Sequence, residues 1–462
     1  MPERHEQLLQ TLTQEYRQAF PRSEQGQERA AKVLVDGISH GARTYRPFPL
    51  RVRAARGAHI TEAGGDSLID YWQGHFANIL GHNPPVVTEG LAAMLQEGYG
   101  LQTGLPEERE AEFAEVLARA TSADQVRLTT SGTLATMYAL MIARAYTGRT
   151  MVLKVGGGWH GANPLALKGV AHSDDGYDHV DSAGVPSSAE QEIVVTRYND
   201  VDALERGFGS YGDQIAAFIF EPCPSIAGFI PATDEYMQAA RHLTSHHGAL
   251  LILDEVITGF RYCASGAQSL YGVQADLSTY GKVIGGGMPI AAVAGRSDLL
   301  ALIGENARPR VWFNGGTYSA HPLSVEGGLL MLRHLIAHED ELYPALAEKG
   351  ERLRQGIERV MAKHGVLARC TGGGNEVIQG SSLGTVYFPL QEDLEPRGAE
   401  ELNDPRLCDV TMTERVLKLG LLLQGVNVMH GLGAISMAHT EEVLERTLEA
   451  FDAVAQRIRA EA

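Results

Sequence analysis

A lysine and a pair of acids stand beside two apolar runs in the second half of the chain. The run ALLILDEVITGFR, residues 249–261, contains Asp254 and Glu255, and LSTYGKVIGGGMPIAAVAGR places Lys282 in a glycine-bounded loop. Ligands of parallel sheets bind beyond the carboxyl ends of strands, where an acid can cap a helix, bind a metal or pair with a cationic heterocycle. A lysine is normally a solvated charge, but in a partly desolvated loop it becomes a usable nucleophile.

Together these two motifs indicate a site for a pyridoxal ring. The lysine would form an imine with the aldehyde of the cofactor, and the carboxylate would keep the pyridine nitrogen protonated, so that the ring acts as an electron sink. A phosphate needs its own cradle, and in RLTTSGTLATMYAL the residues Ser131, Gly132 and Thr133 lie between a predicted strand and a predicted helix. Free backbone N–H groups and the helix dipole favour an anion there. An isolated Ser-Gly-Thr would be an ordinary helix N-cap, but its order relative to the other two motifs favours the phosphate.

The elements that must position these residues alternate between apolar strands and amphipathic helices from residue 92 to residue 322. This alternation predicts an α/β fold with a mostly parallel central sheet flanked by helices. A helix is expected from Thr133 to Tyr146, ending before Gly148. The predicted strands are residues 125–129, 150–155, 215–220, 249–253 and 291–294.

The two ends of the chain have a different pattern. The first fifty residues predict an amphipathic helix, which buries leucines and Tyr16, followed by an irregular arm from Pro21 that packs on a partner subunit. Residues 57–72 alternate like a hairpin with a Gly-Gly turn. We expect an N-terminal arm and small-domain segment at residues 1–91, a large cofactor-binding domain at 92–322, and a smaller α/β C-terminal domain at 323–462.

The composition restricts the class of protein. The 462 residues, 44% of them hydrophobic and 21% charged, fit a soluble enzyme of two or three packed units. The formal net charge of -18 disfavours a nucleic-acid-binding surface. Four cysteines without a CxxC pair predict reduced thiols, and the opening residues lack the apolar core of a signal peptide or a membrane span. We expect a cytoplasmic protein with no membrane partner, no nucleic acid and no metal, because HExxH is absent around His242 and His246.

Three motifs give the chain a resemblance to a known family. The sequences DEVITGFR, YGKVIGGGMP and NGGTYSAHPLS are similar to motifs of the class III aminotransferases, which belong to fold type I of the pyridoxal-phosphate enzymes. The resemblance runs from roughly Arg43 to the C-terminus, and the stretch from Gly259 to Lys282 also resembles the glutamate-1-semialdehyde 2,1-aminomutase branch. It implies pyridoxal 5'-phosphate as the cofactor and a homodimer with shared active sites.

The resemblance also implies roles for individual residues. Lys282 resembles the lysine that holds the cofactor in a Schiff base, Asp254 the partner of the pyridine nitrogen, and Val256 the apolar residue under the ring. Residues 131–133 resemble the phosphate loop. Thr317 resembles the threonine that reaches the phosphate of the neighbouring subunit.

Other positions keep alternatives open. Trp159, followed by His160, stands where the family has a Tyr or Phe stacked on the ring, although it could be a core aromatic. Glu221 resembles a glutamate near the cofactor oxygen and the substrate, or it is a structural cap at a strand end. Arg43 resembles an arm arginine that grips a substrate carboxylate. The neighbouring alternatives for that last role are Arg46 and Arg51.

Departures from the family pattern bear on the reaction. Leu134 replaces a glutamate that commonly follows Ser-Gly-Thr, and Gly431 or a neighbour stands where the aminomutase branch carries an acidic residue. We expect a ping-pong aminotransferase that moves an amino group from a carboxylate-bearing amino acid, β-amino acids included, to a 2-oxo acid. The alternatives are an aminomutase or another isomerase or racemase, and a catalytically silent homologue. The intact Lys282 and Asp254 argue against the silent homologue.

Overall fold

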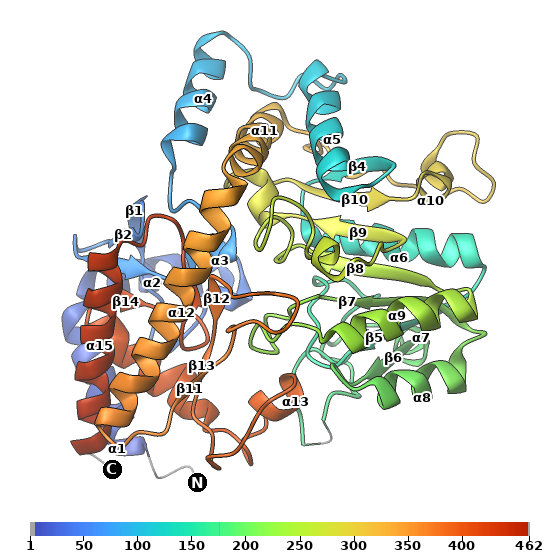
Figure 1. The fold of residues 1–462 in the computed structure, drawn as a ribbon. Coiled ribbons are helices and arrows are strands. Elements are labelled where there is room, and N and C mark those ends of the chain that lie inside the picture. Colours follow the sequence, from blue (N-terminus) through green and yellow to red (C-terminus); the bar gives the residue numbers. More distant parts are fainter. Residues whose placement is uncertain (1–4, 175, 461–462) are drawn as a thin grey trace.

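A seven-stranded sheet forms the centre of the larger part of the molecule (Figure 1). The computed structural model describes residues 5–174 and 176–460. The strand order is β4-β10-β9-β8-β7-β5-β6, and only β10 runs antiparallel to its neighbours. The predicted mostly parallel sheet is therefore confirmed. In sheet order the strands are Gln125–Thr129, Ala291–Gly295, Leu277–Tyr280, Leu250–Glu255, Ile215–Phe220, Met151–Val155 and Ile193–Thr196.

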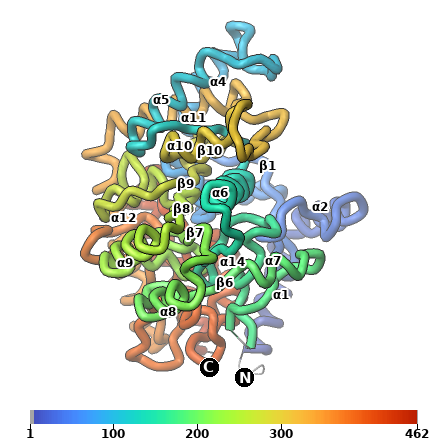
Figure 2. Tube along the Cα trace, turned by 90° about the vertical axis from the view of Figure 1, so that its right-hand side faces the viewer, coloured from blue at the N-terminus to red at the C-terminus, as the bar shows by residue number. Residues whose placement is uncertain are grey.

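Helices cover both faces of this sheet because its strands are apolar on both sides. On β7, Ala217 and Ile219 share a core with α6 (Gly132–Thr147), while Phe218 and Phe220 share a core with α8 (Val201–Tyr211) and α9 (Asp234–His247). Figure 2 shows α6 towards the viewer, with α8 and α9 to its left. On the second face, α5 (Glu108–Thr121) and α11 (Pro322–Ala337) pack near β4 and β10.

The smaller part of the molecule is built from both ends of the chain. The sheet β1-β2-β3-β14 consists of Val52–Arg56, His59–Glu62, Ser67–Asp70 and Val426–Asn427. The predicted hairpin is confirmed as β2–β3, and β14 joins β3 in parallel. Helices α1 (Glu6–Ala19), α12 (Glu339–Lys363) and α15 (Glu441–Ala460) bury one shared apolar core with this sheet. The domain boundaries at residues 91 and 322 stay predictions.

Shorter elements complete the fold. Two-stranded pairs join β11 (Arg369–Cys370) to β13 (Val386–Tyr387) and β12 (Leu383–Gly384) to β15 (Gly433–Ala434). The remaining helices are α2 Pro21–Ala31, α3 Gln73–Phe76, α4 Pro85–Gln96, α7 Ser187–Glu192, α10 Ser297–Leu300, α13 Ala399–Leu402 and α14 Lys418–Leu423. The short turns are η1 Val35–Gly37, η2 Gly41–Arg43, η3 Ala267–Tyr271, η4 Lys282–Gly285, η5 Ala301–Ile303 and the π-helix η6 Met412–Leu417.

The structure corrects two predictions of local structure. Pro21 does not begin an irregular arm but opens α2, because a proline at the first helical position gives up an N–H that would have no partner there. Strand β8 ends at Glu255, so both acids belong to the strand itself. Within residues 5–174 and 176–460, no helix is long and apolar enough to cross a membrane, and no three His, Cys, Asp or Glu side chains are grouped to hold a metal.

Candidate active site

Asp254 is a buried carboxylate held by three neighbours at the carboxyl end of β8. Thr279 Oγ donates to its Oδ1 at 3.0 Å, and the backbone N–H of Val256 donates to the same oxygen at 3.1 Å. His160 Nδ1 lies 2.8 Å from the other carboxylate oxygen. Thr279 can reach it because β9 pairs with β8 in parallel and places Thr279 opposite Asp254. The arrangement keeps a fixed carboxylate at the edge where ligands of parallel sheets bind.

His160 connects that carboxylate to the segment after β5. The imidazole is fully buried, and burial lowers its pKa, although the neighbouring Asp254 opposes this shift. The backbone carbonyl of His160 accepts from Thr136 Oγ at 2.6 Å, which attaches the segment to α6. Its Nε2 finds no protein partner among the described residues. A buried ring atom of this kind is available to a bound group.

Lys282 follows β9 at the same edge of the sheet. It opens the short turn η4 with φ at +49°, in the left-handed region that a residue with a side chain rarely adopts. Burial lowers the pKa of its ammonium, while Asp254 and Glu221 oppose that shift. A lower pKa makes the neutral amine, which is the nucleophilic form, easier to reach.

The start of α6 lies against Val256. A Cβ on Gly132 would lie 2.9 Å from both γ carbons of Val256, so only glycine fits at this contact. Ser131 is the N-cap, and its hydroxyl accepts from the backbone N–H of Leu134 at 3.3 Å. Thr133 also packs tightly, because a Cβ on Gly161 would come within 2.5 Å of its hydroxyl. The predicted phosphate loop is thus a helix N-terminus beside Val256.

Glu221 and Trp159 approach the site from neighbouring strands. Glu221 follows β7 and accepts from the backbone N–H of Trp159 at 2.9 Å. Burial raises the pKa of Glu221, and the nearby Asp254 raises it further. The Trp159 side chain is partly exposed, so it is not a core aromatic. Glu255, next to Asp254, points elsewhere and accepts from the backbone N–H groups of Ala267 and Gln268.

Arg43 comes from the N-terminal part of the chain, where it ends the short turn η2. It lines a cavity of about 380 Å³ with Trp72 and His75, and its Nε donates to His75 Nε2 at 3.5 Å. Burial lowers the pKa of His75 to about 4, and the positive charges of His40, Arg43 and Lys282 contribute. Arg43 and Lys282 therefore act on the same imidazole.

The other arm arginines and Thr317 are placed differently. Arg51 donates to Gln27 and to the carbonyl of Gly37, so its guanidinium holds η1, and Arg46 is exposed. Thr317 lies in an exposed loop, where its carbonyl accepts from Gln102 Nε2 at 2.9 Å. Its role across a subunit boundary stays a prediction.

Sequence reasoning missed two residues that the structure adds to the site. Thr279 is in the strand LSTY, whose polar residues resembled a loop, and only the strand register shows that it faces Asp254. His75 belongs to residues 73–76, which all have positive φ. The glycine in WQGHF was the one sequence signal for such a turn.

These features fit pyridoxal phosphate. A ring between Val256 and the exposed face of Trp159 would have Asp254 at one end and the helix N-terminus of α6 at the other. Lys282 and the unpartnered His160 Nε2 complete the surroundings. The fold and the site therefore define a pyridoxal-phosphate-dependent enzyme of fold type I. The family model described as aminotransferase class-III matches residues 40–378, and the chain belongs to this family.

The proteins that are similar to this chain are named either as aminomutases or as transaminases. The glutamate-1-semialdehyde 2,1-aminomutase of Pyrobaculum aerophilum is 36% identical over 94% of this chain and 99% of its own. A solved transaminase with pyridoxal phosphate bound superposes with a TM-score of 0.82 at 29% identity, covering 96% of this chain and 99% of its own. A β-phenylalanine aminotransferase from Variovorax paradoxus gives a TM-score of 0.83 at 27% identity, over 96% of both chains.

Proposed function

We propose that the chain is an aminotransferase that moves an amino group from a carboxylate-bearing amino acid, with β-amino acids included, to a 2-oxo acid. The observation that carries this choice is Gly431, which we align with the acidic residue of the aminomutase branch. Its φ is +80°, and a Cβ there would lie 2.6 Å from the carbonyl oxygen of Val386. This position therefore has no room for an acidic side chain. The two similar solved transaminases support the same choice.

In the proposed function, the residues around the cofactor hold it and move a proton. Pyridoxal phosphate, when bound, supplies an electron sink for the substrate carbon. Lys282 would hold it covalently and, once released, carry a proton as a neutral amine. Asp254 would accept a hydrogen bond from the pyridine nitrogen, while His160 and Thr279 keep that carboxylate in place. Residues 131–133 would donate to the phosphate.

The remaining roles concern the rim of the site. Trp159 would cover the ring, and Glu221 would face the cofactor oxygen and the substrate. Arg43 would bind the substrate carboxylate as a bidentate donor beside His75. Thr317 would reach the phosphate in the partner subunit of a homodimer. We also propose a cytoplasmic enzyme.

The experiment is a donor screen with and without an acceptor. The loaded enzyme is incubated with α- and β-amino acids, each with pyruvate, with 2-oxoglutarate or with no 2-oxo acid. We expect alanine or glutamate to form only when donor and acceptor are both present. Isomerisation of glutamate-1-semialdehyde without any acceptor would instead establish the aminomutase, which the 36% identity to such an enzyme keeps as the second candidate.

A further inference from the structure

Lys154 is a buried cation whose hydrogen bonds all go to the backbone. It is the fourth residue of β5, and only 1% of its surface is exposed. Its Nζ donates to the carbonyls of Gly158 at 2.9 Å, Ala166 at 3.2 Å and Lys168 at 2.7 Å. An ammonium has three N–H donors, so these three bonds use all of them.

All three acceptors belong to residues 156–168, which we call the β5 segment. It contains neither helix nor strand, and apart from an isolated bridge between Lys168 and Val180 its carbonyls have no ladder of partners. A buried carbonyl without a donor is unfavourable, and so is a buried ammonium without acceptors. Here the Lys154 ammonium supplies the donors for the three carbonyls, and the carbonyls supply the acceptors for the ammonium. Burial lowers the pKa of Lys154 to about 8, against the opposing charges of Asp181 and Glu221.

The three bonds tie the beginning of the β5 segment to its end. Gly158 directly precedes Trp159 and His160, whereas Ala166 and Lys168 close the segment. Between these ends, the carbonyl of His160 accepts from Thr136 and also from Asn163 Nδ2 at 3.2 Å. The loop is therefore fixed on both sides of the two residues that face the cofactor site.

The held segment supplies two contacts at the strand ends. The backbone N–H of Trp159 donates to Glu221, and His160 Nδ1 lies against Asp254. Gly158 packs closely against the His160 ring and the end of β5, because a Cβ there would lie 3.1 Å from both His160 Nε2 and the carbonyl of Val155. A shift of the Gly158 carbonyl would therefore move Trp159 and His160 together.

We propose that Lys154 is a positioning residue for the reaction: it gathers three carbonyls of the β5 segment and so sets Trp159 over the cofactor and His160 against Asp254. The proposal rests on the function proposed above. It assigns Lys154 no contact with substrate or cofactor, since it acts through the segment. A lysine is needed because an apolar side chain of equal length would leave all three carbonyls without donors.

The test compares Lys154→Met with Lys349→Met on α12. Lys349 is the control because its Nζ also donates to a backbone carbonyl, that of Met437 at 2.9 Å. Lys349 and Met437 both lie outside the β5 segment. Both variants should melt at lower temperature than the unsubstituted enzyme.

Only Lys154→Met should change the cofactor. We expect a weaker visible circular dichroism per bound pyridoxal phosphate, weaker pyridoxal phosphate binding, and a kcat roughly 10- to 100-fold lower, the size of loss that a small misplacement causes. Lys349→Met should keep the dichroism and the binding constant. The first two measurements need no substrate, so they report on Lys154 even if the donor screen finds no transamination.

Two results would overturn the proposal. One is an unchanged cofactor dichroism and kcat in Lys154→Met, and the other is an equal spectral change in Lys349→Met. If Lys154→Met aggregates, Lys154→Gln, which keeps two N–H donors, takes its place and should show the same spectral change at smaller size. An unchanged spectrum in Lys154→Gln then counts against the proposal as well.

Discussion

At the scale of single residues, the chemistry we propose depends on an amine whose pKa is lowered although carboxylates lie next to it. Burial lowers the pKa of Lys282, although Asp254 and Glu221 favour its charged form. Both acids therefore counteract the desolvation without outweighing it. The left-handed φ of Lys282 shows that the turn η4 adopts a strained conformation at this residue, as is common at functional sites.

Substitution of Lys282 by alanine should abolish turnover. The variant keeps its fold, because Lys282 lies in a turn and not in a packed core. We expect it to lose the visible absorbance of covalently held cofactor, since no other amine is proposed to bond there. The control is Lys349→Ala on α12, whose Nζ donates to the carbonyl of Met437 at 2.9 Å. Multiple turnovers by Lys282→Ala would disprove the assignment.

The main chemical residues could be predicted from the sequence, whereas their supports could not. Asp254 and Lys282 stand at strand ends beside apolar runs, a pattern that local sequence contains. Thr279 supports Asp254 only because β8 and β9 pair in one register, and Lys154 meets its carbonyls only after the β5 segment has folded. Contacts of this kind depend on tertiary structure, which periodicity does not report.

At the scale of elements, the end of β3 depends on Asp70. Its carboxylate accepts from the backbone N–H groups of Trp72 and Gln73, from Asn427 Nδ2 on β14, and lies 2.8 Å from His82 Nε2. Burial by itself would raise the pKa of Asp70, but these partners outweigh it and hold the pKa below its usual value. The residue therefore joins β3, α3 and β14 in its ionised form.

Stability should follow the ionisation of Asp70. A carboxyl whose pKa is lower in the folded state stabilises the protein above its unfolded pKa, near 4, and loses that contribution as the pH falls through the folded value. We expect Asp70→Asn to melt below the unsubstituted enzyme at pH 7, and the difference to shrink as the pH falls below about 4. Thermal melts between pH 3 and pH 7 measure this. A difference that is the same at every pH would contradict the prediction.

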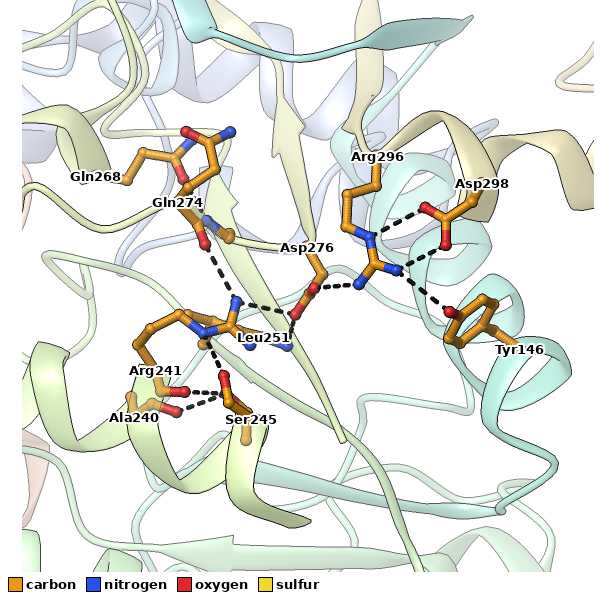
Figure 3. A network of polar contacts seen from close by, with 12 residues as sticks. Tyr146, Ala240, Arg241, Ser245, Leu251, Gln268, Gln274, Asp276, Arg296 and Asp298 are labelled. Carbon is orange, nitrogen blue, oxygen red and sulfur yellow. Dashed lines mark hydrogen bonds and ion pairs between the residues drawn. The ribbon is translucent and has the colours of Figure 1, made fainter. Parts of the chain in front are cut away.

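A second polar network lies in the seven-stranded sheet, at the strand ends that are remote from Lys282 (Figure 3). Asp276 precedes β9 and accepts from Arg241 at 3.0 Å, from Arg296 at 2.7 Å and from the backbone N–H of Leu251 at 2.8 Å. Arg296 also binds Asp298 at 2.6 Å. The network joins α9, β8, β9 and β10 at the ends remote from Lys282.

Asp276 should matter for stability and not for chemistry. Asp276→Asn leaves two arginines without their shared carboxylate, and because both are partly exposed we expect a loss of about 2 kcal/mol. Asp298→Asn removes a half-exposed partner of the same Arg296 and should cost at most about 0.5 kcal/mol. Thermal unfolding compares the two, and kcat should stay unchanged in both. A lower kcat in the folded Asp276→Asn variant would connect this network to the site.

The elements also show where prediction from sequence ends. The five predicted strands appear with shifts of at most two residues at either end, because all but the first are apolar runs. Strands β6 and β9 have only four residues each, and neither of them was predicted from the sequence. The β3–β14 pairing joins residues more than 350 positions apart, and no local pattern contains it.

At the scale of the whole molecule, one exposed region has the character of a subunit interface. Leu101, Leu105, Trp312 and Tyr318 are all more than half exposed, although they are large and apolar. Gln102 Nε2 donates to the carbonyl of Thr317, so the two segments lie side by side. Exposed apolar patches of this kind mark contacts between proteins. We expect the partner to be a second copy of the chain, because most soluble oligomers are symmetric homo-oligomers.

We therefore expect a homodimer in which each site uses the partner's Thr317. Trp312→Glu combined with Tyr318→Glu should give monomers in light scattering, while Tyr211→Glu on α8, another exposed aromatic, should not change the mass. The decisive measurement mixes two inactive variants, Lys282→Ala and Thr317→Glu, by unfolding and refolding them together. Random pairing yields half mixed dimers, each with one site that has both Lys282 and the partner's unsubstituted threonine, so activity should return to about a quarter of the unsubstituted level. No recovery, from two variants that refold as dimers separately, would place the whole active site within one chain.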